Sequence, residues 1–145
     1  MSELDQVSKP LLEVKGLRKY FPIQHGILRN TVGWIKAVDG VDLELGRGET
    51  LGVVGESGSG KTTIARVVAG LIDATEGSVM FNGGGNEVDI TTLDTKDKKL
   101  ARRNMQMIFQ DPYSSLNARM PILEIVGEPL IAHGIASGQE LKDQV

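Results

Sequence analysis

The sequence predicts an α/β fold, and three neighbouring patterns between residues 41 and 71 support that prediction. Residues 41–45 alternate apolar and acidic side chains, which is typical of a half-buried β-strand. Residues 51–54 form a short apolar run of the kind that is buried on both faces of a parallel sheet. After a glycine-rich turn, apolar residues recur every three or four positions from Ile64 to Leu71, which predicts an amphipathic helix ending near Gly70. Strand, loop and helix therefore form one unit.

The flanking residues predict a single domain over residues 11–145, preceded by a flexible polar lead-in at residues 1–10. Further strands are expected at 11–14 and 78–81, and a short charged helix is expected at 97–103. Residues 21–35 contain proline, glycine and asparagine without a sustained period, so we expect a long excursion between strands there.

The end of the sequence predicts a helix that has little room to form. Ser137-Gly138-Gln139-Glu140 has the Ser-x-x-Glu form of a capping box, which opens helices. Only five residues follow it, whereas an isolated helix needs about 12–15 residues to be more than marginally stable. The sequence is therefore interpreted as a fragment of a longer domain.

Composition excludes several classes of protein. The 145 residues carry 16 Lys plus Arg against 19 Asp plus Glu, a net charge of −3, and no basic cluster, which argues against a nucleic-acid partner. The absence of Cys excludes disulfides and thiolate metal sites. The acidic N-terminus is unlike a signal peptide, and no apolar run approaches the ~18 residues of a membrane span. We expect a soluble, intracellular protein.

Residues 55–62 match G-x-x-x-x-G-K-[ST], the Walker A phosphate-binding motif. Its glycines let the backbone adopt positive φ, so that successive N–H groups form a concave nest facing an anion. The helix that follows directs the positive end of its dipole to the same place. Lys61 can bridge the β and γ phosphates, and the Thr62 hydroxyl can bind magnesium. The strand before the motif and the helix after it are the context that the motif requires.

Two segments of the sequence resemble the ATPases of ATP-binding-cassette (ABC) transporters. The first is KAVDGVDLELGRGETLGVVGESGSGKTT at residues 36–63. The second, MQMIFQDPYSSLN at residues 105–117, is similar to the segment around the Q-loop glutamine in the branch that energises oligopeptide, dipeptide and nickel importers. The resemblance extends from Leu11 to the end of the chain. It departs from the branch at Ala118, where proline is usual, which puts the rigidity of that loop in doubt.

The resemblance implies a P-loop NTPase core of the ABC ATPase type with an N-terminal antiparallel β portion, truncated before the Walker B motif. It implies that ATP and Mg²⁺ are bound, with Thr62 and Gln110 at the metal, Lys61 and Gln110 in catalysis, and Phe21 or its neighbour Tyr20 stacked on adenine. The alternative for the aromatic residue is a core role at the end of the first strand. The remaining nucleotide contacts are the loop residues Gly55, Glu56, Ser57, Gly58, Ser59, Gly60, Lys61, Thr62 and Thr63.

The resemblance also implies partners and a location. A second ATPase subunit, identical or different, would complete the nucleotide sandwich, and transmembrane permease subunits would be contacted near residues 110–116. The protein would then be cytoplasmic and peripheral on the inner face of the cell membrane. The cargo stays open among peptide, nickel and glutathione.

The residues that complete ATP hydrolysis in the family are missing from the sequence. An apolar run ending in Asp-Glu, an LSGGQ signature and the later switch histidine are all absent, so we expect the fragment to be inactive alone. Two alternatives remain. A compact P-loop kinase or GTPase could use Asp111 as its magnesium carboxylate, and a non-hydrolysing module could use the loop only to bind nucleotide.

Overall fold

A computed structural model describes residues 9–26, 29–111, 116–117 and 119–145. The chain forms two compact units that divide after Met107, and each is described by itself. Most of the predicted lead-in, and Ala118, lie outside the described residues.

The first unit contains a four-stranded sheet. Its strands are β1 (Leu12–His25), β2 (Asn30–Leu45), β3 (Glu76–Phe81) and β4 (Val88–Asp89). They lie in the order β2-β1-β3-β4, and every neighbouring pair is antiparallel. The antiparallel β portion is therefore confirmed, and the predicted strands at 11–14, 41–45 and 78–81 all lie within it.

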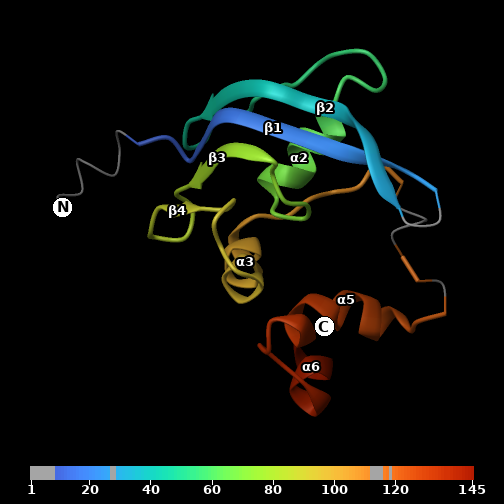
Figure 1. Ribbon diagram of the computed structural model, residues 1–145. Helices are drawn as coiled ribbons and strands as arrows, with labels where there is room; N and C mark the ends of the chain where they lie inside the picture. The colour runs from blue at the N-terminus through green and yellow to red at the C-terminus, as the bar shows by residue number, and fades with distance from the viewer. Residues whose placement is uncertain (1–8, 27–28, 112–115, 118) are drawn as a thin grey trace. The chain divides into compact units, whose positions relative to one another are not determined.

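The predicted excursion over residues 21–35 is wrong, because β1 and β2 continue through most of it. Their pairing extends from Leu12↔Leu45 to His25↔Asn30, whereas β3 pairs with β1 only as far as Arg18↔Glu76. Beyond that point residues 19–25 and 30–38 form a two-stranded ribbon that projects from the sheet (Figure 1). Several register shifts interrupt the pairing, so the apolar alternation that marks a strand in sequence is lost.

A small aliphatic core lies between the sheet and helix α2 (Lys61–Val68). The helix forms as its three- and four-residue apolar spacing predicts, and it directs the buried Val67 into this core. Helix α3 (Thr95–Ala101) begins at Asp94, whose carboxylate accepts from Asp97 N at 2.8 Å, and continues into the 3-10 turn η1 (Arg102–Asn104). The buried core residues are Leu12, Val14, Leu17, Val38, Val67, Val79, Phe81 and Ile90.

The strand predicted at residues 51–54 does not form. The segment has no regular secondary structure, and the side chain of Val54 is 93% exposed. A strand is stabilised by hydrogen bonds to a neighbour, and the sheet in the described residues contains no parallel pair that this segment could join. The predicted buried strand at residues 51–54 is therefore wrong for the described residues.

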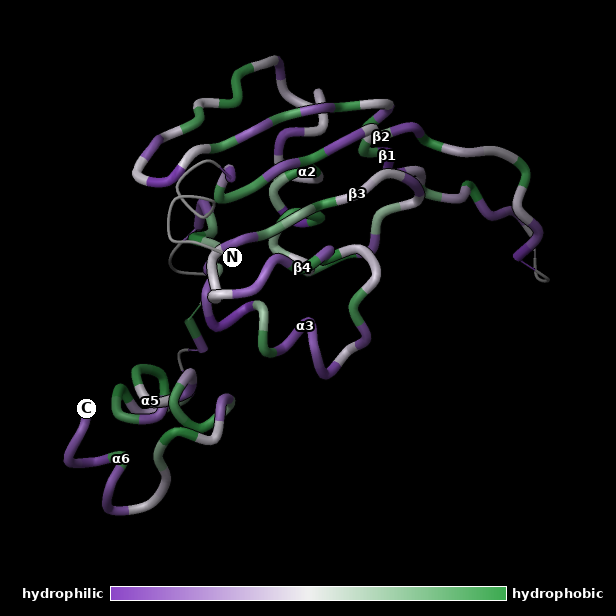
Figure 2. Tube along the Cα trace, turned by 90° about the vertical axis from the view of Figure 1, so that its left-hand side faces the viewer, coloured by the Kyte–Doolittle hydropathy of each residue, from purple (hydrophilic) through white to green (hydrophobic). Residues whose placement is uncertain are grey.

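The second unit contains helices α5 (Ile122–Ala132) and α6 (Gly138–Gln144). The sequence analysis did not predict α5, a largely apolar helix (Figure 2). The two helices meet at Gly127, where an added Cβ would lie 2.9 Å from Leu141 Cδ1. Helix α6 follows Ser137 as predicted, although the Ser137 side chain makes no capping hydrogen bond. Among the described helices, none has the length and apolar character needed to cross a bilayer.

Candidate functional site

The glycine-rich loop at residues 55–62, hereafter the phosphate loop, leads directly into α2. Gly58 (φ 81°) and Gly60 (φ 93°) adopt the left-handed conformation that only glycine takes without strain. Gly60 is the N-cap of α2, and no side chain caps the helix. The N–H groups of the first helical turn therefore remain available to an anion. A Cβ at Gly58 would meet nothing within 4 Å, so the loop is open to solvent there.

The Lys61 side chain folds back over the phosphate loop. Its Nζ donates to the carbonyl oxygens of Gly55 at 2.7 Å and Glu56 at 2.6 Å, and lies 3.3 Å from Ser59 Oγ. The ammonium is thus held among the loop's own oxygen atoms. In this position it can exchange the carbonyl groups for phosphate oxygens, which are stronger acceptors.

The loop fits a magnesium ion that arrives with a triphosphate. Thr62 is exposed in the first turn of α2, where its hydroxyl is available to a hydrated cation. Within the described ranges there is no group of three or more His, Cys, Asp or Glu side chains that could hold a metal. Magnesium commonly binds through one or two protein oxygens together with substrate phosphates, and a single hydroxyl suits that mode.

The two candidate adenine-stacking residues differ in their surroundings. The Tyr20 hydroxyl donates to Asp39, and Lys36 Nζ lies 5.2 Å from the centre of the Tyr20 ring. Phe21 has no polar group, its side chain is 38% exposed, and Lys19 Nζ lies 5.0 Å from the centre of its ring. Successive strand residues face opposite sides, so the two rings cannot serve the same site. The geometry favours Phe21 as the stacking surface.

The base of the ribbon lies against the phosphate loop. A Cβ added to Gly60 would overlap the carbonyl oxygen of Ala37 and lie 3.5 Å from Val38 Cγ2. Residues from β2 and the phosphate loop, more than twenty positions apart in the chain, therefore meet at this contact. The sequence analysis did not foresee this contact, because nothing in the local pattern around Ala37 marks it.

Gln110 lies in the second unit. It is exposed, and residues 105–109 before it form neither helix nor strand. Its place beside magnesium and the attacking water therefore stays a prediction. The alternative role of Asp111 as a magnesium carboxylate needs a strand ending just before it, and the irregular segment does not provide one. Residues 112–115, part of the expected permease contact, lie outside the described residues.

Asp39 is a polar residue that the sequence analysis missed. Its carboxylate accepts from the Tyr20 hydroxyl and from Lys36 Nζ at 3.2 Å, and it lies 3.3 Å from Arg18 Nε. A sequence signal does exist: residues 19–38 carry Lys19, Arg29 and Lys36 but no acidic residue, and Asp39 follows at once. A carboxylate in that position is the natural partner of the cations beside it.

The contacts of Asp39 predict its titration. The Tyr20 hydroxyl and then Lys36 hold the pKa of the Asp39 carboxyl below its ordinary value of 3.8. Since the pKa is lower in the folded state, the stabilisation is present above the unfolded value and is lost as the pH falls through the folded value. We expect the Asp39 Cγ resonance to titrate below pH 3.8, and its pKa to move up towards the ordinary value in Tyr20→Phe, where Lys36 and Arg18 still lower it. An unchanged midpoint in that variant would contradict the contact.

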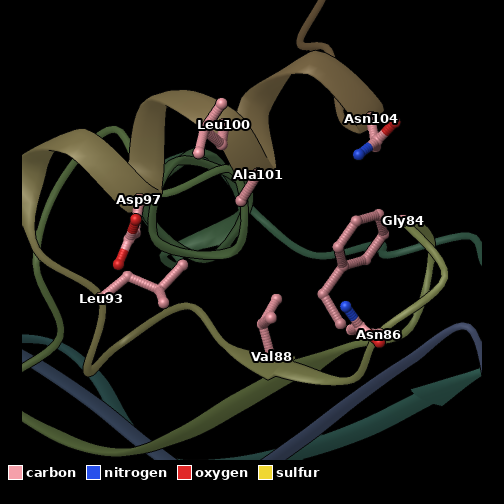
Figure 3. A pocket seen from close by; sticks show the side chains of 9 residues that line it. Gly84, Asn86, Val88, Leu93, Asp97, Leu100, Ala101 and Asn104 are labelled. Carbon is pink, nitrogen blue, oxygen red and sulfur yellow. The ribbon is translucent and has the colours of Figure 1, made fainter.

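A separate pocket of about 410 Å³ lies between α3 and the β3–β4 connection (Figure 3). Val88, Leu93 and Ala101 converge on it, and Gly83 allows the Phe81 ring to pack closely on the backbone, since a Cβ there would overlap the ring. None of the residues that the sequence predicts for nucleotide binding contributes to it. Its lining residues are Phe81, Gly84, Asn86, Val88, Leu93, Asp97, Leu100, Ala101 and Asn104.

Comparisons with known proteins identify relatives of this chain. The chain is 44% identical over 136 residues to the oligopeptide transport ATP-binding protein AppF of Bacillus subtilis, which covers 93% of this chain and 40% of AppF. It is 44% identical over 151 residues to OppF of Salmonella typhimurium, which covers all of this chain and 43% of OppF. The chain thus spans about two fifths of the length of these relatives.

Solved structures show the same fold. The ATP-binding cassette MJ0796, in a dimeric post-hydrolysis state bound to ADP and Pi, matches with a TM-score of 0.70 and 27% identity, over 92% of this chain and 53% of that one. This match confirms the predicted ABC ATPase fold class. The family model described as ABC transporter matches residues 38–144, which include the phosphate loop and Gln110. The chain belongs to the ABC transporter family.

Proposed function

We propose that this chain is the nucleotide-binding part of an ATPase subunit that energises an importer of oligopeptides or dipeptides, with ATP and Mg²⁺ as its ligands. The observation that carries the proposal is the Lys61 ammonium, held over an open glycine loop at the start of an uncapped helix. Membership of the ABC transporter family supports ATP as the nucleotide. The oligopeptide relatives AppF and OppF support a peptide cargo.

Each residue of the proposed site has its own role in binding the nucleotide. The N–H groups of the phosphate loop and of the first turn of α2 neutralise phosphate oxygens. Lys61 bridges the β and γ phosphates, Thr62 holds magnesium, and Phe21 supplies an apolar face for adenine. Gln110 orients water and contributes an oxygen near the metal without adding charge. Bound Mg·ATP supplies the phosphoanhydride bond whose hydrolysis drives transport.

We further propose that two such subunits enclose the nucleotide and act on permease subunits at the inner face of the cell membrane. The dimeric state of MJ0796 supports the pairing, and the transport names of the relatives support the permease partners. The permease contact is assigned to the segment from Gln110 to Leu116.

A titration of the 145-residue chain with Mg·ATP, followed by NMR, tests the proposal. We expect weak binding that shifts the amides of residues 55–63, and no measurable steady-state phosphate release. Weak affinity and absent turnover are expected because the sequence contains neither the apolar run ending in Asp-Glu nor the LSGGQ signature that complete the site in the family. Phosphate release at rates typical of whole transporter ATPases would contradict the expected inactivity. Shifts confined to other residues would contradict the site.

The alternative of a non-hydrolysing nucleotide-binding module is distinguished from an ATPase by measuring Mg·ATP binding and phosphate release on a longer protein. If a form of the protein that includes the missing Asp-Glu and LSGGQ segments binds Mg·ATP but releases no phosphate, the binding-module alternative is correct.

A further inference from the structure

The most connected polar cluster in the first unit surrounds a β-bulge next to the phosphate loop. Lys19 pairs with Val38, but the next residue of β1, Tyr20, pairs with Lys36. Ala37 is therefore the extra residue of a bulge in β2. Bulges redirect side chains and are frequent beside functional sites. This one turns the Ala37 carbonyl towards Gly60, the residue at which α2 begins.

The pairing beyond the bulge shows which side of the ribbon each aromatic residue faces. From Tyr20 to Ile23 the pairing is regular, so Tyr20 and Lys36 share one face, and Phe21 and Ile35 share the other. A Cβ at Gly33 would lie 3.4 Å from Ile23 Cδ1, as expected if Ile23 lies on the Phe21 face. Loss of the extra residue would move the β2 side chains beyond it, Lys36 included, to the opposite face and away from Tyr20. The bulge therefore keeps Lys36 on the Tyr20 face, while Phe21, the next residue of β1, lies on the other face.

Asp39 bonds to residues on both sides of the bulge. Before it, Arg18 lies 3.3 Å away and also pairs with Glu76 at the start of β3. After it, the Tyr20 hydroxyl and Lys36 Nζ both donate to the same carboxylate. The Tyr20 amide is fixed in addition by Thr75 Oγ1 at 2.9 Å. A single carboxylate thus connects the sheet to the part of the ribbon that carries Phe21.

We propose that Asp39 is a positioning residue of the nucleotide site: by holding Tyr20 and Lys36 on one face of the ribbon, it fixes the neighbouring Phe21 on the other face. The proposal rests on the proposed binding of ATP with adenine stacked on Phe21. Asp39 itself does not touch the nucleotide. Its loss therefore weakens recognition of the base and leaves recognition of the phosphates largely intact, because the phosphates are bound by residues 55–62.

The test compares Mg·ATP with Mg·tripolyphosphate, which lacks the base and ribose, by NMR titration of the 145-residue chain. We expect Asp39→Ala to raise the Kd for ATP by about fivefold or more, the lower end of what losing one base–aromatic stack costs. The Kd for tripolyphosphate should change by less than about twofold. Asp39→Asn, which keeps an acceptor for the Tyr20 hydroxyl, should recover part of the ATP affinity. Asp73→Ala, which removes a more exposed acid that is likewise paired with a lysine, Lys98 at 2.5 Å, is the control and should change neither Kd.

The outcomes distinguish failure of the adenine site from failure of the positioning role of Asp39. If the wild-type chain binds ATP no better than tripolyphosphate, the adenine site fails, and the positioning role fails with it. If the wild-type chain prefers ATP and Asp39→Ala keeps that preference, only the positioning role is wrong. If Asp39→Ala does not fold, the variant Tyr20→Phe tests the positioning role instead, because it removes only the hydroxyl that donates to Asp39. Like Asp39→Ala, Tyr20→Phe should reduce the preference for ATP over tripolyphosphate. An unchanged preference would overturn the proposal.

Discussion

Lys61→Ala is expected to abolish detectable binding of Mg·ATP while leaving the chain folded. The Lys61 ammonium can form at least two charge-assisted hydrogen bonds to phosphate oxygens, each contributing about 1.5–3 kcal/mol. Their loss lowers the affinity by roughly 100-fold or more. The fold is retained because the hydrogen bonds of Lys61 all lie within the exposed phosphate loop. The measurement is the NMR titration of residues 55–63, together with the thermal shift that Mg·ATP produces.

Lys96→Ala is the matched control for this prediction. Lys96 is an exposed lysine of α3, so its removal changes the net charge equally without touching the phosphate loop. It should leave nucleotide binding unchanged. If the thermal shift by Mg·ATP survives in Lys61→Ala, Lys61 is not the phosphate-binding residue.

Gly60→Ala is expected to destabilise the first unit and to displace the phosphate loop. The added methyl group meets the Ala37 carbonyl, and it also forces a residue with a side chain to adopt φ 93°. Overpacking costs about 1–3 kcal/mol and the left-handed conformation about 1–2 kcal/mol, so the sum is roughly 2–5 kcal/mol. Urea unfolding of the variant and of the wild-type chain measures the difference in the free energy of unfolding.

The variant Gly58→Ala distinguishes backbone strain from the steric clash as the cause of the lost stability. Gly58 has φ 81°, but a Cβ there meets nothing within 4 Å, so this variant introduces the backbone strain without the clash. It should cost about 1–2 kcal/mol, clearly less than Gly60→Ala. Equal losses in the two variants would show that the ribbon does not lie against Gly60.

Several elements could be predicted from the sequence because their signals are local. Helix α2 follows from apolar residues at three- and four-residue spacing, and the phosphate loop follows from glycines placed before Lys61. Helix α3 follows from its charged run behind the Asp94 cap. In each case residues close in sequence make the hydrogen bonds that form the element.

The errors lie where pairing is not local. The run at residues 51–54 has the composition of a buried strand, but composition cannot supply the neighbour to which a strand bonds. Residues 21–35 lack a period because the ribbon extends beyond β3 and is interrupted by bulges. Both segments were assigned from pattern alone, and their conformation depends on partners far away in the chain.

The order of residues alone was sufficient for the family, and it predicted a phosphate-binding lysine and its glycines, because the motif lies within eight consecutive positions. It named Phe21, with its neighbour Tyr20 as the alternative, and gave no sign of the contact between Ala37 and Gly60. The paired strands distinguish the two rings, since Tyr20 lies opposite Lys36 just beyond the bulge at Ala37, and Phe21 lies opposite Ile35 on the other face. A bulge is a property of two strands in register, and no single stretch of sequence contains it.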